Sequence, residues 1–312
     1  MDKLYQQLET KLGLGKIKQD EPLSSHTTFQ IGGQADYYFE VVTTNELVKA
    51  IKTAKHLQIP YFVLGGGSNI LVGDKGFRGL VIKNKSKELK ILSYSGEVIN
   101  QKDARNDRNL RQTSGLKINN ILVKADSGVL FNQLVRFTIE EGLGGLEEFL
   151  GLPGTVGGAV SGNAHWQNKL VNDYIISKKY ADNILLSVVF KLTKADKNSL
   201  WQKAKRAVDY RQKSQPTYPS AGCIFKNIKK SQAARLGLPD LTTSAGFLIE
   251  AAGLKGTRIG NVQISPLHAN FIINLGYGKA SDVIKLISLV KKTVKEKFTI
   301  DLQEEIIKIG VF

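Results

Sequence analysis

The sequence predicts an α+β protein of two or three domains, and three observations indicate this class. First, 312 residues are more than a single hydrophobic core usually holds. Second, an apolar fraction of 42% and a charged fraction of 23% are ordinary for a folded soluble protein. Third, short apolar runs with strand character alternate with amphipathic helical segments, and no run reaches the length of a membrane span.

The amino-terminal part predicts a helix, a strand and a second helix. Residues 37–42 have the composition of a strand. The helix after this strand should begin at an N-cap threonine, Thr43 or Thr44, and end near His56. Residues 1–20 are expected to form the first helix, with an apolar face made of Leu4, Leu8, Leu12 and Leu14.

A glycine-rich loop follows the next strand. The buried strand 61–64 runs directly into residues 65–69, and further strands are expected at 70–72 and 80–82. The most basic stretch, residues 83–124, is expected to form a sheet hairpin with a long polar tip. That tip, residues 101–113, has almost no apolar content and is expected to be an exposed loop.

The second half continues the alternation of helices and strands. A turn-rich segment at residues 215–220 is the expected domain junction. Regular elements are expected at 132–141 (a helix that Gly142 ends), 184–192 (a strand), 198–213 (a basic helix) and 298–302 (a strand).

The formal net charge of +16 is open to three interpretations. It can reflect lysine-rich solvated faces, attraction of small anions such as dinucleotides and sugar nucleotides, or nucleic-acid binding. The first is the favoured account and the second a modest functional one. The third is the weakest, because the basic residues are spread along the chain and no helix-turn-helix, zinc-finger or aromatic RNA-binding motif is present. We therefore expect small anionic ligands, with neither nucleic acid nor membrane as a partner.

Cysteine and histidine usage limits the remaining classes. Cys223 is the single cysteine, so no internal disulfide forms and a reducing cytoplasm is the expected location. The first residues lack the basic-then-apolar pattern of a signal peptide. No metal is expected, because the histidines have no metal-ligand spacing: His26, His56, His165 and His268.

Two glycine-rich loops, at 65–69 and 151–158, are the main candidates for anion binding. Glycine lets the backbone approach a ligand closely and turn its N–H groups toward phosphate oxygens. For either loop alone, a tight turn that binds no ligand is the more common case. Neither loop is a dinucleotide fingerprint or a P-loop. The lysine that a P-loop requires is missing, and no helix is expected directly after either loop. Two such loops in one chain favour a large ligand with several phosphates.

Five ordered blocks resemble the UDP-N-acetylenolpyruvoylglucosamine reductase family over nearly the whole chain, from about Glu21 to Gly310. They are Thr-Thr-Phe-Gln-Ile-Gly-Gly at 27–33, Leu-Gly-Gly-Gly-Ser-Asn at 64–69, Gly-Leu-Pro-Gly-Thr-Val-Gly-Gly at 151–158, Ser-Ala-Gly-Cys-Ile-Phe-Lys-Asn at 220–227 and His-Ala-Asn-Phe at 268–271.

The resemblance implies an FAD-binding domain of the vanillyl-alcohol-oxidase type in two subdomains, plus a smaller α/β substrate domain. The corresponding boundaries are 1–83 with 299–312 returning to it, 84–205, and 206–298. The implied activity is reduction of UDP-N-acetylglucosamine enolpyruvate to UDP-N-acetylmuramate by a monomeric, cytoplasmic, NADPH-dependent flavoprotein in peptidoglycan synthesis. The resemblance assigns FAD binding to Gly65, Gly66, Gly67, Ser68, Asn69, Gly154, Thr155, Val156, Gly157 and Gly158.

The resemblance also implies two acids. Cys223 stands where the family has a proton-donating serine, and Glu305 falls on the family's catalytic glutamate. A thiol, with a reference pKa of about 8.5, is a better acid than an alcohol. The alternative for Cys223 is a small buried apolar residue, the common fate of a free cysteine. Asn227 and His268 are expected to bind substrate, although a structural role for His268 is equally open.

Two family arginines are missing. Ile175 stands in the Tyr-Arg-x-Ser block, whose arginine polarises the substrate carboxyl, and Ile307 stands in the carboxy-terminal block. Arg211 is a candidate replacement in substrate binding, although its position matches the family's basic helix. Losing a preorganised charge typically costs about 3–4 kcal/mol of transition-state stabilisation. A flavin- or UDP-sugar-binding homologue without turnover is therefore the alternative function.

Overall fold

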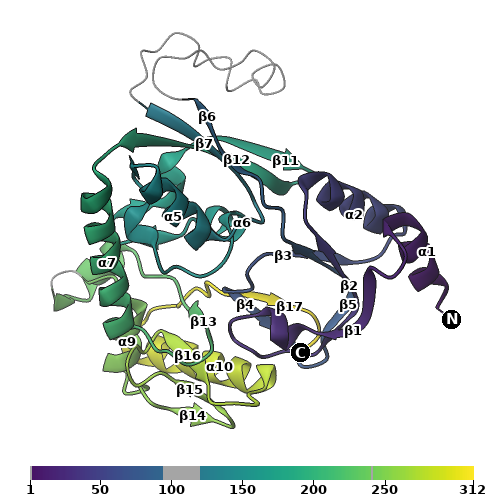
Figure 1. The fold of residues 1–312 in the computed structure, drawn as a ribbon. Helices are drawn as coiled ribbons and strands as arrows, with labels where there is room; N and C mark the ends of the chain where they lie inside the picture. Colours follow the sequence, from purple (N-terminus) through teal and green to yellow (C-terminus); the bar gives the residue numbers. More distant parts are fainter. Residues whose placement is uncertain (1, 94–119, 240–241) are drawn as a thin grey trace. The chain divides into compact units, whose positions relative to one another are not determined.

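The chain forms two compact units, each with its own hydrophobic core. The computed structural model describes residues 2–93, 120–239 and 242–312 (Figure 1). Unit 1 comprises residues 1–17, 39–66 and 81–211, and unit 2 comprises residues 18–38, 67–80 and 212–312. The three-part division expected from the sequence stays a prediction.

Two strands continue from one unit into the other. They are β2 (Gln34–Val41), which crosses the boundary after Tyr38, and β5 (Phe77–Asn84), which crosses it after Leu80. With β1 (Ile17–Pro22) and β3 (Tyr61–Leu64) they form a four-stranded sheet in the order β1-β2-β5-β3.

Unit 1 is built on a five-stranded antiparallel sheet. Its neighbours are β11-β12-β7-β6, with β8 paired to β12. Val188 and Phe190 of β12 point into the main core of unit 1, whereas Val189 between them packs on the opposite face. Figure 1 shows α5 and α6 together on one side of this sheet. The strands are β6 (Leu89–Ser93), β7 (Asn120–Asp126), β8 (Leu143–Gly144), β11 (Ile175–Ala181) and β12 (Ile184–Lys194).

Helix α2 of unit 1 begins at a residue whose side chain caps it. Thr43 is the N-cap of α2, and its hydroxyl accepts the Glu46 N–H at 3.1 Å. The helices are α1 (Lys3–Leu12), α2 (Thr44–His56), α5 (Phe131–Glu140), α6 (Val156–Ser161) and α7 (Lys197–Ser214), with 3-10 turns η2 (Glu147–Phe149) and η3 (Val171–Tyr174) and the short hairpin β9 (His165–Trp166) and β10 (Lys169–Leu170).

Unit 2 packs helices against a four-stranded antiparallel sheet in the order β13-β16-β15-β14. The long helix α10 buries one apolar face at helical spacing, including Val283, Leu286 and Val290. In a separate pair, β17 lies parallel to β4. The elements are η1 (Leu23–His26), β4 (Ile70–Val72), β13 (Ser220–Cys223), α8 (Lys230–Arg235), α9 (Ala245–Ala251), β14 (Arg258–Ile259), β15 (Val262–Ile264), β16 (Phe271–Asn274), α10 (Ala280–Phe298) and β17 (Ile307–Ile309).

The expected helix over residues 1–20 is wrong in its second half. Helix α1 stops at Leu12 because Gly13 adopts a φ of 124°. The buried carboxylate of Glu9 accepts the N–H groups of Gly15 at 2.7 Å and Ile17 at 3.2 Å, which turns the chain into β1. The leucine expected at the end of the apolar face, Leu14, is 83% exposed.

The strand expected at 298–302 is also wrong. Helix α10 continues to Phe298, and Thr299 ends it in the left-handed region with a φ of 57°. Ile300 and Leu302 are buried in the unit 2 core, but their backbone is irregular. Their apolar alternation therefore reflects burial in the core.

The other expected elements agree with the structure to within a few residues. Helices α2, α5 and α7 and strands β3, β4, β5 and β12 are confirmed. Strands β6 and β7 pair antiparallel, as the expected hairpin requires, whereas its polar tip at 101–113 lies outside the described residues. In the part of the chain that the structure describes, no helix is long and apolar enough to cross a membrane.

Candidate active site

The backbone of unit 2 brings β13, β16 and the carboxy-terminal segment together around Cys223. Cys223 lies opposite Phe271 in the β13–β16 pair. The next residue, Ile224, donates its N–H to Asn270 O at 2.8 Å and accepts the Glu305 N–H at 2.8 Å. Cys223 and Glu305, 82 residues apart in the sequence, therefore lie on adjacent backbone segments.

Asn270 holds the segment after Cys223 in place. Its side-chain oxygen accepts the Phe225 N–H at 2.9 Å, and its Nδ2 donates to Phe225 O at 2.8 Å. Asn270 is buried, and its side chain also forms a hydrogen bond with the Cys223 thiol. A two-point contact of this kind leaves Phe225 little freedom to rotate and so fixes the end of β13.

The Cys223 thiol is held in its protonated form. Burial raises the pKa of Cys223 to about 12, and the negative charge of Glu305 adds to this effect. The hydrogen bond with Asn270 opposes both influences. At neutral pH the site therefore contains a thiol that keeps its proton beside a carboxyl group.

The carboxy-terminal end of the first glycine-rich loop is hydrogen-bonded to the segment that carries Glu305. Asn69 donates its Nδ2 to Glu305 O at 3.2 Å, and Asn69 O accepts the Ile307 N–H at 3.0 Å. A Cβ added at Gly222, which has a φ of 75°, would lie 4.0 Å from Ser68 O. Ser68 and Asn69 thus lie beside β13 and the segment that carries Glu305.

The amino-terminal end of the same loop lies against the second glycine-rich loop in unit 1. A Cβ on Gly65 would lie 2.5 Å from Thr155 Oγ1, and one on Gly66 would lie 2.4 Å from Gly154 Cα. Both distances are shorter than any side chain tolerates, so this close approach requires glycine. The two loops predicted to share one ligand are therefore neighbours.

The second loop leads into a helix, contrary to the sequence-based expectation. Thr155 is the N-cap of α6, and its hydroxyl accepts the Gly158 N–H at 3.3 Å. The N–H groups of Val156 and Gly157 donate to Val129 O and Ser127 O, each at 2.8 Å. These three donors are therefore engaged within the protein.

The first loop is better placed to donate hydrogen bonds to a phosphate. Within the described residues, the N–H groups of Gly66 and Gly67 donate to no acceptor of the chain. Gly158 adds open space, since a Cβ there would meet only Thr155 Oγ1 at an ordinary 3.7 Å. Packing against the described residues therefore does not require glycine at this position. Free N–H donors and a glycine-lined space fit the phosphates of FAD.

Arg211 is committed to the fold of unit 1. Its guanidinium donates to Leu150 O and to Glu148 O, the latter at 2.7 Å. It also stacks over the Trp166 ring at 3.9 Å and is only 5% exposed. These contacts join α7 to the segment before Gly151, and they stabilise a buried cation that has no carboxylate partner among the described residues.

The other two expected substrate-binding residues also make structural contacts. His268 Nδ1 accepts the Asn270 N–H at 3.2 Å, and burial lowers the pKa of the ring. Asn227 Oδ1 accepts the N–H of Ala245, the first residue of α9, at 3.2 Å. Any contact of His268 with substrate would use Nε2.

The two missing arginines have no direct replacement at their own positions. Ile175 lies opposite Phe190 in the β11–β12 pair and packs against the unit 1 core. Ile307 is 50% exposed. The adjacent Lys308 forms an ion pair with Glu304 at 2.7 Å.

Sequence reasoning did not single out Asn270 as a site residue. It lies in the block 268–271 that supported the family resemblance, and its amide side chain just before an apolar strand was the available signal. An amide in that position is expected to be hydrogen-bonded when buried.

Comparisons with known proteins agree with this arrangement. The FAD binding domain family matches residues 35–182, and the family "UDP-N-acetylenolpyruvoylglucosamine reductase, C-terminal domain" matches residues 214–309. The reductase of Caldicellulosiruptor bescii is 37% identical over 94% of this chain and 91% of its own length. That of Bacillus subtilis is 32% identical over 99% of both chains. The crystal structure of the Thermus caldophilus reductase is 29% identical, covers 94% of this chain and 98% of its own, and superposes with a TM-score of 0.67. The chain therefore belongs to the UDP-N-acetylenolpyruvoylglucosamine reductase family and contains its FAD-binding domain.

Proposed function

We propose that the protein reduces UDP-N-acetylglucosamine enolpyruvate to UDP-N-acetylmuramate with NADPH, as a step in the synthesis of peptidoglycan precursors. The observation that carries this proposal is the placement of Cys223 next to the backbone segment of Glu305, with Asn270 holding the residues that follow Cys223, in a chain of this reductase family. Reducing a carbon–carbon double bond needs a hydride and a proton, and this group of residues supplies the proton.

Cys223 is the proposed proton donor to the substrate carbon next to the carboxylate. A donor has to carry its proton at working pH, and a thiol pKa of about 12 meets that condition. Glu305 disfavours the thiolate, so its charge favours the return of a proton to Cys223 after turnover. Asn270 orients the thiol through their hydrogen bond.

FAD is the proposed redox cofactor and, when bound, supplies the hydride. The residues proposed to hold it are those at 65–69, whose Gly66 and Gly67 N–H groups are free to bind phosphate, and those at 154–158, where Gly158 leaves room. Asn227 and the Nε2 atom of His268 are the proposed polar contacts to the sugar nucleotide. Arg211 is proposed to support the segment that leads into the second loop.

The experiment that tests the function is NADPH oxidation by FAD-loaded protein, with and without the enolpyruvyl sugar nucleotide. We expect NADPH consumption to require that substrate, with UDP-N-acetylmuramate formed in equal amount. NADPH oxidation that does not respond to the sugar nucleotide would reject the proposal.

A second candidate function is flavin or UDP-sugar binding without turnover. The observation that favours it is Ile175, whose packing against the unit 1 core leaves no cation at a position where the family has arginine. This alternative predicts tight FAD binding together with no substrate-dependent NADPH oxidation. The assay above therefore separates the two functions.

We also propose that the protein acts in the cytoplasm as a monomer. The presence of a single cysteine, which cannot form an internal disulfide, supports a reducing compartment. Light scattering of the FAD-loaded protein at several concentrations tests the oligomeric state, for which we expect a constant mass near 34.4 kDa.

A further inference from the structure

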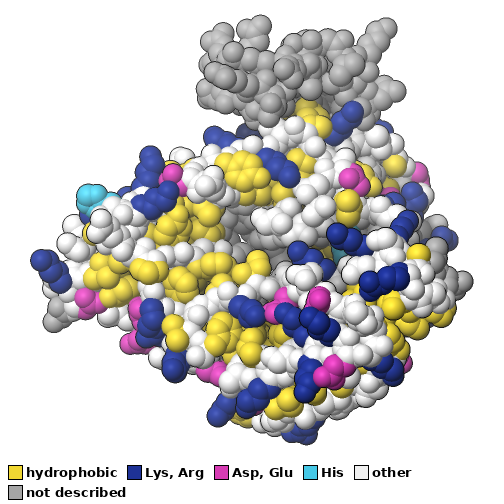
Figure 2. Space-filling model, turned by 180° about the vertical axis from the view of Figure 1, so that it is seen from behind, with side chains coloured by type: hydrophobic (Ala, Val, Ile, Leu, Met, Phe, Trp, Pro, Cys, Tyr) yellow, Lys and Arg dark blue, Asp and Glu magenta, His cyan; other side chains and the backbone are white. Residues whose placement is uncertain are grey.

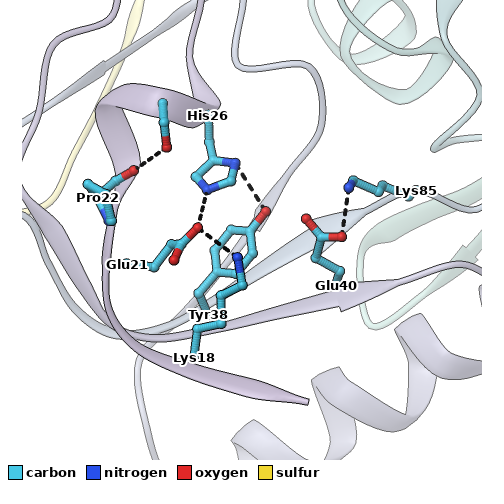
Figure 3. Close-up of polar contacts among 8 residues, drawn as sticks. Lys18, Glu21, Pro22, His26, Tyr38, Glu40 and Lys85 are labelled. Carbon is cyan, nitrogen blue, oxygen red and sulfur yellow. Dashed lines mark hydrogen bonds and ion pairs between the residues drawn. The ribbon is translucent and has the colours of Figure 1, made fainter. Parts of the chain in front are cut away.

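Three side chains from the amino-terminal part of unit 2 form a connected group, the Glu21–His26–Tyr38 anchor (Figure 3). His26 Nε2 lies 2.8 Å from Glu21 Oε1, and the Tyr38 hydroxyl lies 3.2 Å from His26 Nδ1. A carboxylate only accepts hydrogen bonds, so Nε2 carries the proton in the first contact. The His26 and Tyr38 rings also stack, with centroids 4.5 Å apart. The single turn η1 is thus tied to β1 and to β2.

The anchor is well shielded from water. The side chains of Glu21 and His26 are 17% and 16% exposed, and Tyr38 is fully buried. Burial works to raise the pKa of Glu21, but hydrogen bonds from His26 and Lys18 outweigh it, so the pKa is lowered and the carboxylate stays charged. Hydrogen bonds to a charged, poorly solvated group are stronger than those at an exposed surface.

The residues that follow the anchor lie directly against the first glycine-rich loop. A Cβ on Gly67 would lie 2.3 Å from His26 O and 2.9 Å from Thr27 Cα. Thr28 donates its N–H to Gly67 O at 3.1 Å. The position of residues 26–28 therefore sets the position of Gly67.

The same residues hold the start of the strand that ends at Cys223. Thr28 Oγ1 donates to Ser220 O at 2.7 Å, and the Ser220 N–H donates to Thr28 O at 3.1 Å. One three-residue segment thus contacts both Gly67 and Ser220. A displacement of that segment would therefore shift both the loop at Gly67 and the strand that begins at Ser220.

We infer that the Glu21–His26–Tyr38 anchor is a positioning element for FAD binding, which holds residues 26–28 so that Gly67 presents its backbone to the cofactor. The inference rests on the proposed function, because it takes FAD as the ligand of the loop at 65–69. None of the three side chains is proposed to touch substrate, so they act through Gly67. Local rather than global loosening is expected, since the unit 2 core does not depend on His26.

The decisive variant is His26→Phe, which keeps a ring to stack on Tyr38 and removes both hydrogen bonds. The matched control is Lys85→Met, which breaks the more exposed Glu40–Lys85 ion pair of 2.6 Å drawn in the same view (Figure 3). Two readouts are compared with wild type in each variant. They are the Kd for FAD from flavin fluorescence and the hydrogen–deuterium exchange of the Thr28 amide in the full chain.

We expect His26→Phe to raise the Kd for FAD by about tenfold, which corresponds to about 1.4 kcal/mol, and to speed exchange at Thr28. Lys85→Met should leave both readouts within about twofold of wild type. Tyr38→Phe removes the hydroxyl contact to His26 and keeps the stacked ring, so both readouts should change in the same direction by a smaller factor. If His26→Phe does not fold, Tyr38→Phe carries the test alone.

Wild-type affinity and exchange in the folded variants would overturn the inference. Wild-type protein that takes up no FAD would instead count against the proposed function. The exchange measurement needs no flavin, so it still tests whether the anchor holds residues 26–28 in place. Faster exchange of the Thr28 amide in His26→Phe would support that role, and unchanged exchange would reject it.

Discussion

At the scale of single residues, the unusual feature is a thiol that resists ionisation. Cysteines in reactive sites normally have lowered pKa values, because a neighbouring cation or helix N-terminus stabilises the thiolate. Cys223 has the opposite surroundings. Burial raises its pKa to about 12, and the negative charge of Glu305 further disfavours the thiolate. Such a thiol is a poor nucleophile and retains its proton, which suits an acid.

Replacing Cys223 should separate proton donation from cofactor reduction. In Cys223→Ala, bleaching of the flavin absorbance by NADPH should match wild type. Recovery of that absorbance on adding the enolpyruvyl sugar nucleotide should slow by about 10²-fold or more, because general acid catalysis contributes that much. Cys223→Ser should retain much of the rate, since a hydroxyl also donates a proton. Stopped-flow absorbance measures both phases, and unchanged recovery in Cys223→Ala would remove the thiol from the mechanism.

The raised pKa also predicts slow alkylation of the single cysteine. At pH 8, a thiol with a pKa of about 12 is ionised only about once in 10⁴ molecules, whereas an ordinary cysteine is ionised in roughly a quarter. Reaction with iodoacetamide should therefore be slow and should keep accelerating above pH 10. Glu305→Gln should speed it at pH 8, because removing the negative charge lowers the thiol pKa.

The matched control for that experiment is Glu304→Gln, which alters the neighbouring carboxylate that pairs with Lys291 and Lys308. Its alkylation rate should stay near that of wild type. A wild-type rate that is half-maximal near pH 8.5 and levels off by about pH 10 would show an unperturbed thiol.

At the scale of elements, the long helix α10 depends on a distant residue for its start. Its own N-cap residue, Lys279, makes no side-chain cap. Asp74 instead accepts the N–H groups of Ala280 at 2.7 Å and Ser281 at 3.0 Å, across 206 and 207 residues. A carboxylate at this end also interacts favourably with the helix dipole.

Asp74→Ala should lower the free energy of unfolding by about 1 kcal/mol at pH 7, as the loss of an N-cap does. Burial works to raise the pKa of Asp74, but hydrogen bonds from Ser281 and Ala280 lower it overall. A lowered folded-state pKa means that the stabilisation is present above pH 4 and disappears as the pH falls through the folded value. Urea unfolding at pH 7 and near pH 3 measures both effects. Asp301→Ala, which removes an exposed pair at the other end of α10, is the control and should change little.

The first glycine-rich loop makes a second prediction about an element. Gly67 has a φ of 68° and no room for a Cβ, whereas Gly253 has a φ of 83° with nothing within 4 Å. Gly67→Ala and Gly253→Ala should therefore each lower the free energy of unfolding by a similar backbone strain of about 1–2 kcal/mol. Only Gly67→Ala should also displace residues 26–28. We expect FAD affinity to fall at least about tenfold in Gly67→Ala alone. Equal FAD affinity in the two variants would show that the close approach at Gly67 does not matter for the cofactor.

At the scale of the whole molecule, the net charge of +16 has to be reconciled with small-molecule chemistry. Many lysines are paired with acidic side chains, as in the Lys124–Glu88 and Lys255–Glu250 pairs. On the face drawn in Figure 2, Lys and Arg side chains are scattered among acidic and apolar ones rather than gathered in one stripe. This distribution favours weak, general attraction of anions.

Salt should therefore weaken the binding of NADPH and the UDP-sugar only mildly. A small anion makes few ionic contacts, so the log–log slope of affinity against salt should lie between zero and about −3. Duplex DNA bound through many phosphates would give a slope of about −5 or steeper. Titrations at several salt concentrations measure this slope, and tight, steeply salt-dependent DNA binding would favour a nucleic-acid partner.

The sequence by itself determined the family, the FAD-binding domain and most of the elements. Ordered glycine-rich blocks and apolar periodicity depend on near neighbours, so they can be recognised along the chain, as in helix α2 with its Thr43 cap. The two wrong elements share a cause. Residues 13–20 and 298–302 have apolar spacing that a helix or strand would have, but Glu9 and the unit 2 core decide their backbone.

Only the tertiary structure decided which side chains meet. The raised pKa of Cys223 depends on burial and on Glu305, the start of α10 depends on Asp74, and the position of Gly67 depends on His26. Each of these contacts joins residues that are far apart in the sequence. Burial, and the charge that a group meets once buried, are properties of the packed fold, so no local pattern carries them.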